Sequence, residues 1–167
     1  GSDSDTGIAI TSLSDGSSIV TGFFTGTANF GDTTLSSAGD IDAYIAKLNA
    51  DGEYQWATKA GGRDSNHGHA ITSLSDGSSI VGGIFRETAS FGDTTLSSAG
   101  SYDGFITKLN ADGEYQWATQ VGSSNNEKTT GLASLSDGSS IVSGYFEKTA
   151  SFGDITLTSA GDTDAFI

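Results

Sequence analysis

The 167-residue sequence contains no cysteine, no proline and no methionine. The absence of cysteine excludes a disulfide framework, a cysteine-ligated zinc or iron–sulfur site and a thiol nucleophile. Basic residues are scarce, because 7 Lys and Arg stand against 21 Asp and Glu, and the formal net charge is -14. So acidic a chain disfavours nucleic acid or an anionic membrane surface as a partner, since each contact would work against the field of the protein.

Long apolar segments are also missing. No run approaches the roughly 20 apolar residues that span a bilayer, and the first residues do not join a charged segment to an apolar one as a signal peptide does. We therefore expect no membrane insertion. The chain begins with Gly1-Ser2 and has no methionine, which predicts a processed or excised piece of a longer protein.

Internal repetition is the dominant feature of the sequence. The string Ser-Leu-Ser-Asp-Gly-Ser-Ser-Ile-Val begins at Ser12, Ser73 and Ser134, so its copies are evenly spaced. Residues 7–67 and 68–128 differ at 19 of 61 positions, which is too similar for independent domains.

This repetition predicts a single repeat domain over residues 1–167. Its units are 7–67, 68–128 and 129–167, and the third unit is incomplete. The part it lacks corresponds to Ala46–Gly61 of the first unit, so the chain stops inside an expected strand.

Each unit has the pattern of short β-strands. Gly, Ser and Thr are frequent, and no sustained helical stripe of apolar residues is present. Asp15-Gly16 and Asp51-Gly52 mark turns, because Asp-Gly is a strong hairpin signal. In the first unit the pattern predicts main strands at 8–13, 18–25, 42–48 and 53–59, with a small hairpin at 27–30 and 33–35.

Four antiparallel strands that recur once in every unit of this length are typical of β-propeller blades. A lone sheet of this size cannot bury both faces, and stacked neighbours solve that problem. The sequence therefore predicts an all-β fold of about three four-stranded propeller blades, with a β-solenoid or a string of small sandwiches as alternatives. Closed propellers need about four or more blades, so we expect self-association, in which two copies give six blades, or further repeats of a longer protein.

The run Asp42–Gly52, Asp-Ala-Tyr-Ile-Ala-Lys-Leu-Asn-Ala-Asp-Gly, resembles the core of a bacterial β-propeller repeat family called SBBP. It recurs over Asp103–Gly113 and begins again at Asp164. The strand Ser18–Phe24 and the segment Tyr54–Thr58 resemble other parts of that repeat. The resemblance implies a propeller fold, a secreted or cell-surface location in bacteria, and a binding or scaffolding role. It implies no catalytic residues.

Recurring acids form the first candidate site. Asp40 and Asp42, Asp103, and Asp162 and Asp164 occupy equivalent positions, and i, i+2 spacing would place two carboxylates on one strand face. Such a pair suits calcium and, less readily, the acid–base pair of a glycosidase. Hydrogen bonding to the adjacent loop backbone is the structural alternative. The sequence predicts no cofactor apart from calcium at these acids.

Aromatic residues form the second candidate site. Tyr54 and Trp56 lie two residues apart, as do their copies Tyr115 and Trp117. Period-two spacing predicts that each pair shares one face of an outer strand. There the rings would stack on a sugar or fill the contact between neighbouring sheets.

Differences between the copies concentrate at the end of the second strand and in the connection between units. Thr21, for example, becomes Gly82 and then Ser143, and Asn66 becomes Glu127. Such variation marks either a binding rim or positions where packing tolerates change.

The sequence carries no nucleophile elbow, phosphate-binding loop or dinucleotide fingerprint. The two histidines, His67 and His69, have no histidine at the equivalent positions of the other units, which argues against a metal site. We expect a non-enzymatic bacterial module that binds a glycan or protein ligand, or acts as a scaffold, through repeated weak sites. A lectin-like glycan binder and a calcium-stabilised adhesion module are the alternatives.

Overall fold

The computed structural model describes residues 3–167; Gly1 and Ser2, which suggested a processed start, lie outside them. The described residues form fifteen β-strands and no α-helix, which confirms the all-β prediction. No helix capable of crossing a membrane is therefore present among residues 3–167.

The first sheet is a four-stranded antiparallel meander in the order β1-β2-β5-β6. A two-stranded hairpin, β3-β4, is inserted between β2 and β5. The bounds are β1 Asp5–Ser12, β2 Ser18–Phe24, β3 Thr27–Phe30, β4 Thr33–Ser36, β5 Asp42–Leu48 and β6 Tyr54–Ala60. The expected strands agree closely at most ends, whereas β1 begins earlier than the alternation predicts.

The second sheet repeats this arrangement in the order β7-β8-β11-β12, with β9-β10 as the inserted hairpin. Its bounds are β7 His67–Ser73, β8 Ser79–Phe85, β9 Thr88–Phe91, β10 Thr94–Ser97, β11 Asp103–Leu109 and β12 Tyr115–Val121. The same sequence signals therefore give the same local structure twice.

The third sheet has three strands in the order β13-β14-β15. They are β13 Glu127–Ser134, β14 Ser140–Phe152 and β15 Ile155–Phe166. Here the hairpin is continuous with the main strands, so β14 and β15 are long. One edge of β15 carries no neighbouring strand in the described chain.

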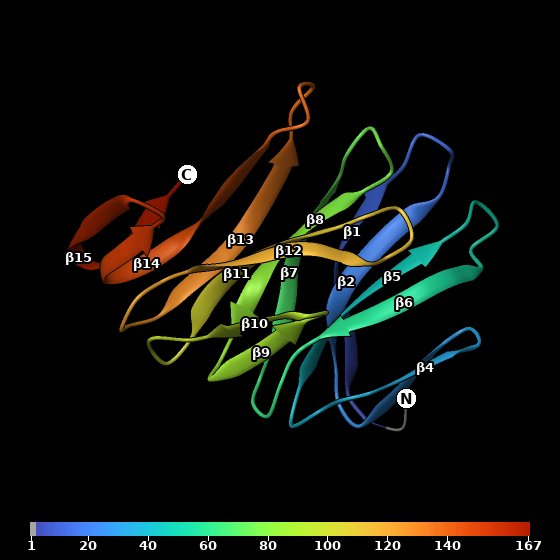
Figure 1. Ribbon diagram of the computed structural model, residues 1–167, viewed down its shortest axis with the longest axis horizontal. Coiled ribbons are helices and arrows are strands. Elements are labelled where there is room, and N and C mark those ends of the chain that lie inside the picture. Colours follow the sequence, from blue (N-terminus) through green and yellow to red (C-terminus); the bar gives the residue numbers. More distant parts are fainter. Residues whose placement is uncertain (1–2) are drawn as a thin grey trace.

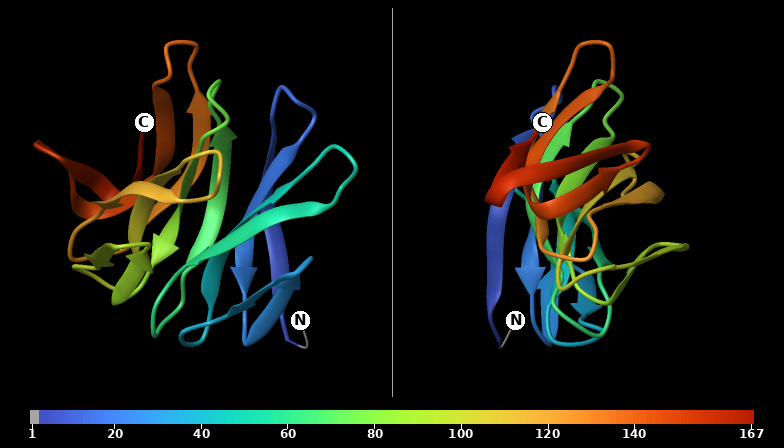
Figure 2. Two further views of the ribbon diagram at one scale, coloured as in Figure 1. Left: turned by 45° about the vertical axis from the view of Figure 1, so that its right-hand side comes forward. Right: turned by 90° about the vertical axis from the view of Figure 1, so that its left-hand side faces the viewer.

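The three sheets follow one another across the molecule in sequence order, as the colours in Figure 1 and the turned views in Figure 2 show. Strand β7 packs against β1 and β2 of the first sheet, and β13 packs against β7 and β8 of the second. The turns after β1, β7 and β13 project at the same end of the molecule. Equivalent loops therefore lie in a row.

Apolar side chains on both faces of the strands form the core between sheets. Ile19 and Ile45 of the first sheet are buried with Ile71, Val81 and Phe85 of the second. Each fully buried side chain of this kind contributes roughly 1.5–3 kcal/mol relative to an exposed one. A separate cluster, comprising Val121, Phe146, Ala150 and Phe166, fills the contact of the second and third sheets.

A compensating substitution links the two contacts between sheets. Thr21 is fully buried, and a Cβ on Gly68 would lie 2.1 Å from its Oγ1. At the contact of the second and third sheets the small and large residues change places: the equivalent of Thr21 is Gly82, and the equivalent of Gly68 is Thr129. A Cβ on Gly82 would lie 2.4 Å from Cγ2 of Thr129. The change from Thr21 to Gly82 is therefore a packing change and not part of an exposed rim.

Candidate functional site

The turn after β1 supplies one side of a polar pocket. Asp15 Oδ1 accepts hydrogen bonds from the Ser17 hydroxyl and from the Ser17 backbone N–H, the latter at 2.9 Å. Gly16 has a φ of 83°, which an L side chain rarely adopts. The Ser17 hydroxyl, followed by the Ser17 N–H, lowers the pKa of the Asp15 carboxyl. The carboxylate is thus held ionised at the turn, as Asp-Gly chemistry predicts.

The turn between β5 and β6 supplies the opposite side. Asn49 Oδ1 accepts from the backbone N–H groups of Asp51 at 3.0 Å and Glu53 at 2.8 Å, and its Nδ2 donates to Glu53 Oε2 at 2.9 Å. Asn110 makes the same three hydrogen bonds one repeat later. Each turn is therefore fixed by its own side chains before any ligand is considered.

The two turns and the outer strand together enclose a pocket that occurs twice. It has a volume of about 360 Å³ on the first sheet and about 590 Å³ on the second. The same six residue types line both, at equivalent positions of the repeat. They are Asp15, Ser17, Lys47, Asn49, Gln55 and Trp56 in the first, and Asp76, Ser78, Lys108, Asn110, Gln116 and Trp117 in the second.

The neighbouring sheet closes the first pocket. Ala111 and Asp112, from the β11–β12 turn, complete its lining. The Trp56 indole N–H donates to the Ala111 carbonyl at 3.0 Å, and the face of this ring lies against Gly113. In the second pocket Trp117 has no such neighbour among the described residues and is 41% exposed. This missing wall agrees with the larger volume of the second pocket.

Both signs of charge are present in each pocket. Lys108 Nζ lies 3.7 Å from Asp76 Oδ2 across the second pocket. Asp76 is largely exposed, so this ion pair stabilises the fold by less than about 1 kcal/mol. The ion pair contributes more to the polarity of the pocket, in which a cation, two carboxylates, two amides and a hydroxyl surround one indole.

The predicted aromatic pairs do not share a strand face. A β-bulge lies opposite Lys47 and Leu48, so Lys47 pairs with Trp56 whereas Leu48 pairs with Tyr54. Because the extra residue shifts the alternation, Tyr54 contacts Phe30 of the β3-β4 hairpin and Trp56 faces the second sheet. The period-two prediction is wrong here.

The second sheet has the same bulge, so Tyr115 and Trp117 also point to opposite faces. Tyr115 packs against the core between the first two sheets, where burial raises its pKa. Trp56 and Tyr115 are therefore largely structural. Tyr54 and Trp117 are each 41% exposed, and Trp117 is the exposed ring that belongs to one of the two repeated pockets.

The recurring acids bond their own loops. Asp42 and Asp103 are fully buried, and each accepts the backbone N–H four residues upstream, at 2.9 Å and 3.1 Å. Asp164 does the same at 2.7 Å. Asp40 lies before β5 and is exposed, as is Asp162 within β15. Residues 3–167 contain no group of three His, Cys, Asp or Glu side chains placed to hold a metal ion.

The structure also reveals a buried acid pair that sequence reasoning missed. In the first unit the Asp42 carboxylate is paired with Lys59, whose Nζ lies 3.1 Å from Asp42 Oδ2, and Asn66 is buried nearby. One repeat later Lys59 is replaced by Gln120 and Asn66 by Glu127. These two substitutions, which remove a cation and add an acid at equivalent positions, are visible in the sequence and could have indicated the pair.

Asp103 and Glu127 come close together at the contact of the second and third sheets. A Cβ placed on Gly122 would lie 2.7 Å from Glu127 Oε2 and 2.9 Å from Asp103 Oδ2. Burial raises the pKa of both carboxyls, and the charge of Asp103 raises that of Glu127 further. Glu127 Oε2 accepts the Ser123 N–H at 2.9 Å, whereas Oε1 is buried without a hydrogen-bond partner.

The two histidines lie together on β7 and are half-buried. The His67 and His69 ring centroids are 5.8 Å apart, and His67 lies 4.5 Å from the ring of Phe23. Burial, with the charge of Lys128, lowers the pKa of His69 to about 4. His69 is therefore neutral near pH 7 and contributes to packing.

No known protein-family profile matches the chain. The chain is 26% identical over 133 residues to the regulatory protein FlaEY of Caulobacter vibrioides. The similarity covers 77% of this chain but 14% of that much longer protein. It links the repeats to a segment of a large bacterial protein.

Proposed function

We propose that the chain is a non-enzymatic, multivalent binding module of a secreted or cell-surface bacterial protein. The observation that carries the proposal is the repeated polar pocket, which is lined by the same six residue types on adjacent sheets. Two related sites at a fixed separation increase the affinity for a repeating ligand without any new contact, because the second binding event becomes intramolecular.

The proposed architecture is a β-propeller in which each sheet is a blade. Two four-stranded antiparallel meanders with the same strand order support it, as does the contact of β1 with β7 and of β7 with β13. In this arrangement the pockets lie near one end of the blades, among the turns. Loops on a rigid β-scaffold are a common place for binding residues.

A glycan is the ligand class that the pocket chemistry favours. The indole of Trp117 offers a flat apolar surface for a sugar ring, and Asn110, Gln116 and Ser78 offer donors and acceptors for hydroxyl groups. The opposed charges of Lys108 and Asp76 add a stronger donor and acceptor. The net charge of -14 disfavours polyanionic ligands.

A glycan array with immobilised, repeating neutral glycans tests this proposal. We expect binding that falls when either Lys47→Ala or Lys108→Ala removes the cation of one pocket, and that is lost when both are changed. Arg63→Ala is the matched control, because it removes the same charge from an exposed position outside both pockets. An array without hits, or an equal loss with the control, would refute glycan binding.

Similarity to a segment of FlaEY, a much longer bacterial protein, supports a module that forms one part of a longer chain. Self-association is the alternative way to cover the two end sheets, and two copies would bring six blades together. Light scattering at micromolar concentration separates the two arrangements, since a stable monomer of 17.0 kDa contradicts self-association.

A further inference from the structure

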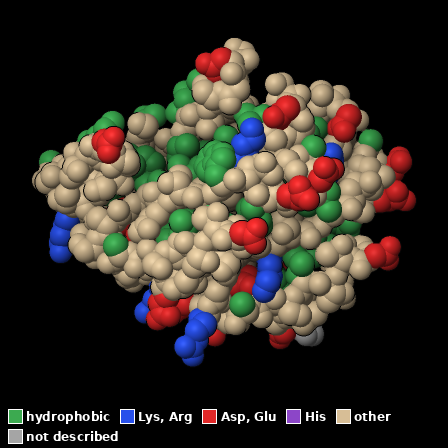
Figure 3. Space-filling view, viewed as in Figure 1, with side chains coloured by type: hydrophobic (Ala, Val, Ile, Leu, Met, Phe, Trp, Pro, Cys, Tyr) green, Lys and Arg blue, Asp and Glu red, His purple; other side chains and the backbone are tan. Residues whose placement is uncertain are grey.

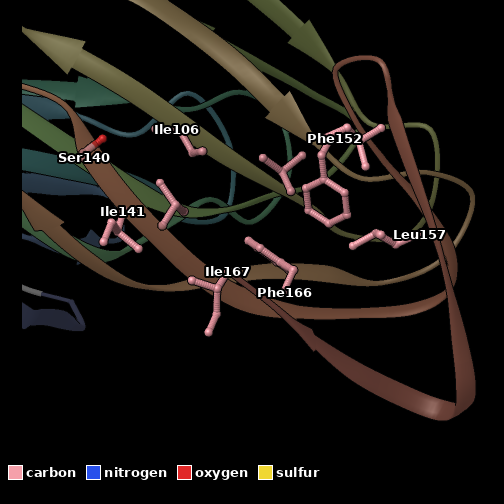
Figure 4. A pocket seen from close by; sticks show the side chains of 10 residues that line it. Ile106, Ser140, Ile141, Phe152, Leu157, Phe166 and Ile167 are labelled. Carbon is pink, nitrogen blue, oxygen red and sulfur yellow. The ribbon is translucent and has the colours of Figure 1, made fainter.

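The third sheet has an apolar groove beside its open edge. The groove has a volume of about 510 Å³, and its lining includes Ile106 and Val121 of the second sheet with Val142, Phe152, Leu157 and Phe166 of the third. Figure 4 shows Ile106 of β11 and Phe152, Leu157 and Phe166 of β14 and β15 around the groove, and the rings of Phe152 and Phe166 lie 4.7 Å apart. Hydrophobic side chains also gather at this end of the molecule in Figure 3.

The first two sheets show what occupies the equivalent place. There, Leu109 at the end of β11 is fully buried, and Tyr115 and Ala118 of β12 pack against the same core. In the third sheet no described residue stands at the positions of these three. The groove is therefore the space that an outer strand fills between the first and second sheets.

Exposure of the groove residues agrees with a missing neighbour. Ile45 of the first sheet is completely buried, whereas Ile106, its equivalent, is only half-buried and lines the groove. Ile155 is 63% exposed and Leu157 37% exposed on the hairpin beside it. Apolar surface left open in this way favours a partner that covers it.

We propose that the groove binds an extended strand of the β12 type, supplied by the outer hairpin of another repeat of this kind. The strand would pair with the free edge of β15 through main-chain hydrogen bonds. Its tyrosine, together with the leucine that precedes the hairpin turn, would fill the groove. This inference rests on the packing of the sheets and not on the ligand proposed for the polar pockets.

The repeat also fixes the register of the incoming strand. In the second sheet Gly104 pairs with Val121 and Phe105 with Gln120. Ala165 and Phe166 are the equivalents of Gly104 and Phe105 on β15. The valine of the bound strand should therefore lie opposite Ala165.

A peptide with the sequence of residues 107–122 is the direct probe. We expect it to bind the intact chain and, at about ten times its dissociation constant, to raise the melting temperature by about 3 °C or more. The same peptide with both Leu109→Asp and Tyr115→Asp should give no shift. Leu157→Asp in the chain should abolish the shift, whereas Ile10→Asp, at an exposed position on the distant first sheet, should preserve it.

Cross-linking tests the register independently, because the chain has no cysteine of its own. A chain with Ala165→Cys should form a disulfide with the Val121→Cys peptide. It should do so much less with the Gln120→Cys peptide, since a shift of one residue turns the side chain to the other face of the sheet. Equal cross-linking of both peptides would overturn the proposed pairing.

Two further results would overturn the proposal. The first is a double negative result: the free peptide does not raise the melting temperature, and the same sequence fused after Ile167 as a covalent fourth strand does not stabilise the chain. The other is a dimer that the peptide does not dissociate and that Leu157→Asp does, which would mean that a second copy covers the groove. Neither result would affect glycan binding at the polar pockets, so failure of the two proposals is distinguishable.

Discussion

Replacing Glu127 with glutamine should stabilise the protein at neutral and alkaline pH. Glu127 is 1% exposed and lies beside buried Asp103, with no cation in the position that Lys59 holds in the first unit. The other acid near Glu127 is Glu147 on β14, whose charge also raises the pKa of Glu127. Glutamine retains an acceptor for the Ser123 N–H, and its amide can donate to Asp103.

The size of the effect follows from the separation of the two carboxyls. Their oxygens lie 2.7 and 2.9 Å from one point beside Gly122, so two full charges there are separated by no more than about 5–6 Å and repel by about 3 kcal/mol at an effective dielectric constant of about 20. Because protonation of either carboxyl would relieve part of this repulsion, we expect a gain of about 1–3 kcal/mol, or about 2–4 °C in melting temperature for each kcal/mol.

The stabilisation by Glu127→Gln should depend on pH. Asp103 and Glu127 have a higher pKa in the folded state than their ordinary values of 3.8 and 4.5. The stability that such acids contribute is fully present when the pH is below their ordinary pKa values. It is lost as the pH rises through their pKa values in the folded state. The difference between Glu127→Gln and the parent should therefore be small at pH 3.5 and should grow towards pH 8.

Urea unfolding at pH 3.5, 5, 6.5 and 8 measures this difference. Glu87→Gln is the control, because it makes the same chemical change at an exposed site and should alter stability by less than about 0.5 kcal/mol at every pH. A variant that is less stable than the parent at pH 8 would refute the reasoning. So would a difference of constant size across the series, since repulsion between ionised groups must vanish when they are protonated.

Three further predictions concern packing between the sheets. Gly68→Thr should cost about 1–3 kcal/mol through collision with Thr21, and the double variant with Thr21→Gly should recover most of it; strictly additive costs in a double-mutant cycle would contradict this. As the pH falls from 6.5 towards 4, protonation of His69 should destabilise the parent by at most about 3 kcal/mol, and His69→Thr should remove this loss. An unchanged pH profile of unfolding would argue against a buried neutral imidazole. Ile80→Ala should cost about 2–5 kcal/mol, whereas Ile141→Ala, its equivalent at 44% exposure, should cost less than about 1; equal losses in urea unfolding would mean that the third sheet is covered in solution.

Local structure was largely readable from the sequence. The Asp15-Gly16 turn and the strands of the first sheet occur where alternation and turn chemistry predict them, because both depend on residues close together in the chain. The opposite orientation of Tyr54 and Trp56 was not predictable in this way. It arises from one extra residue in the β6 ladder, and a bulge depends on how the partner strand is paired.

Sequence by itself determined the repeating unit and its length, the all-β class and the types of residue that recur in each unit. Tertiary structure decided which of those recurring residues meet. It buried Asp42 in its own loop, joined Asp103 to Glu127 across two sheets and assembled the polar pockets from turns and strands far apart in sequence. The reason is physical: backbone preference acts within a few residues, whereas burial and close approach of charges depend on which sheet faces which.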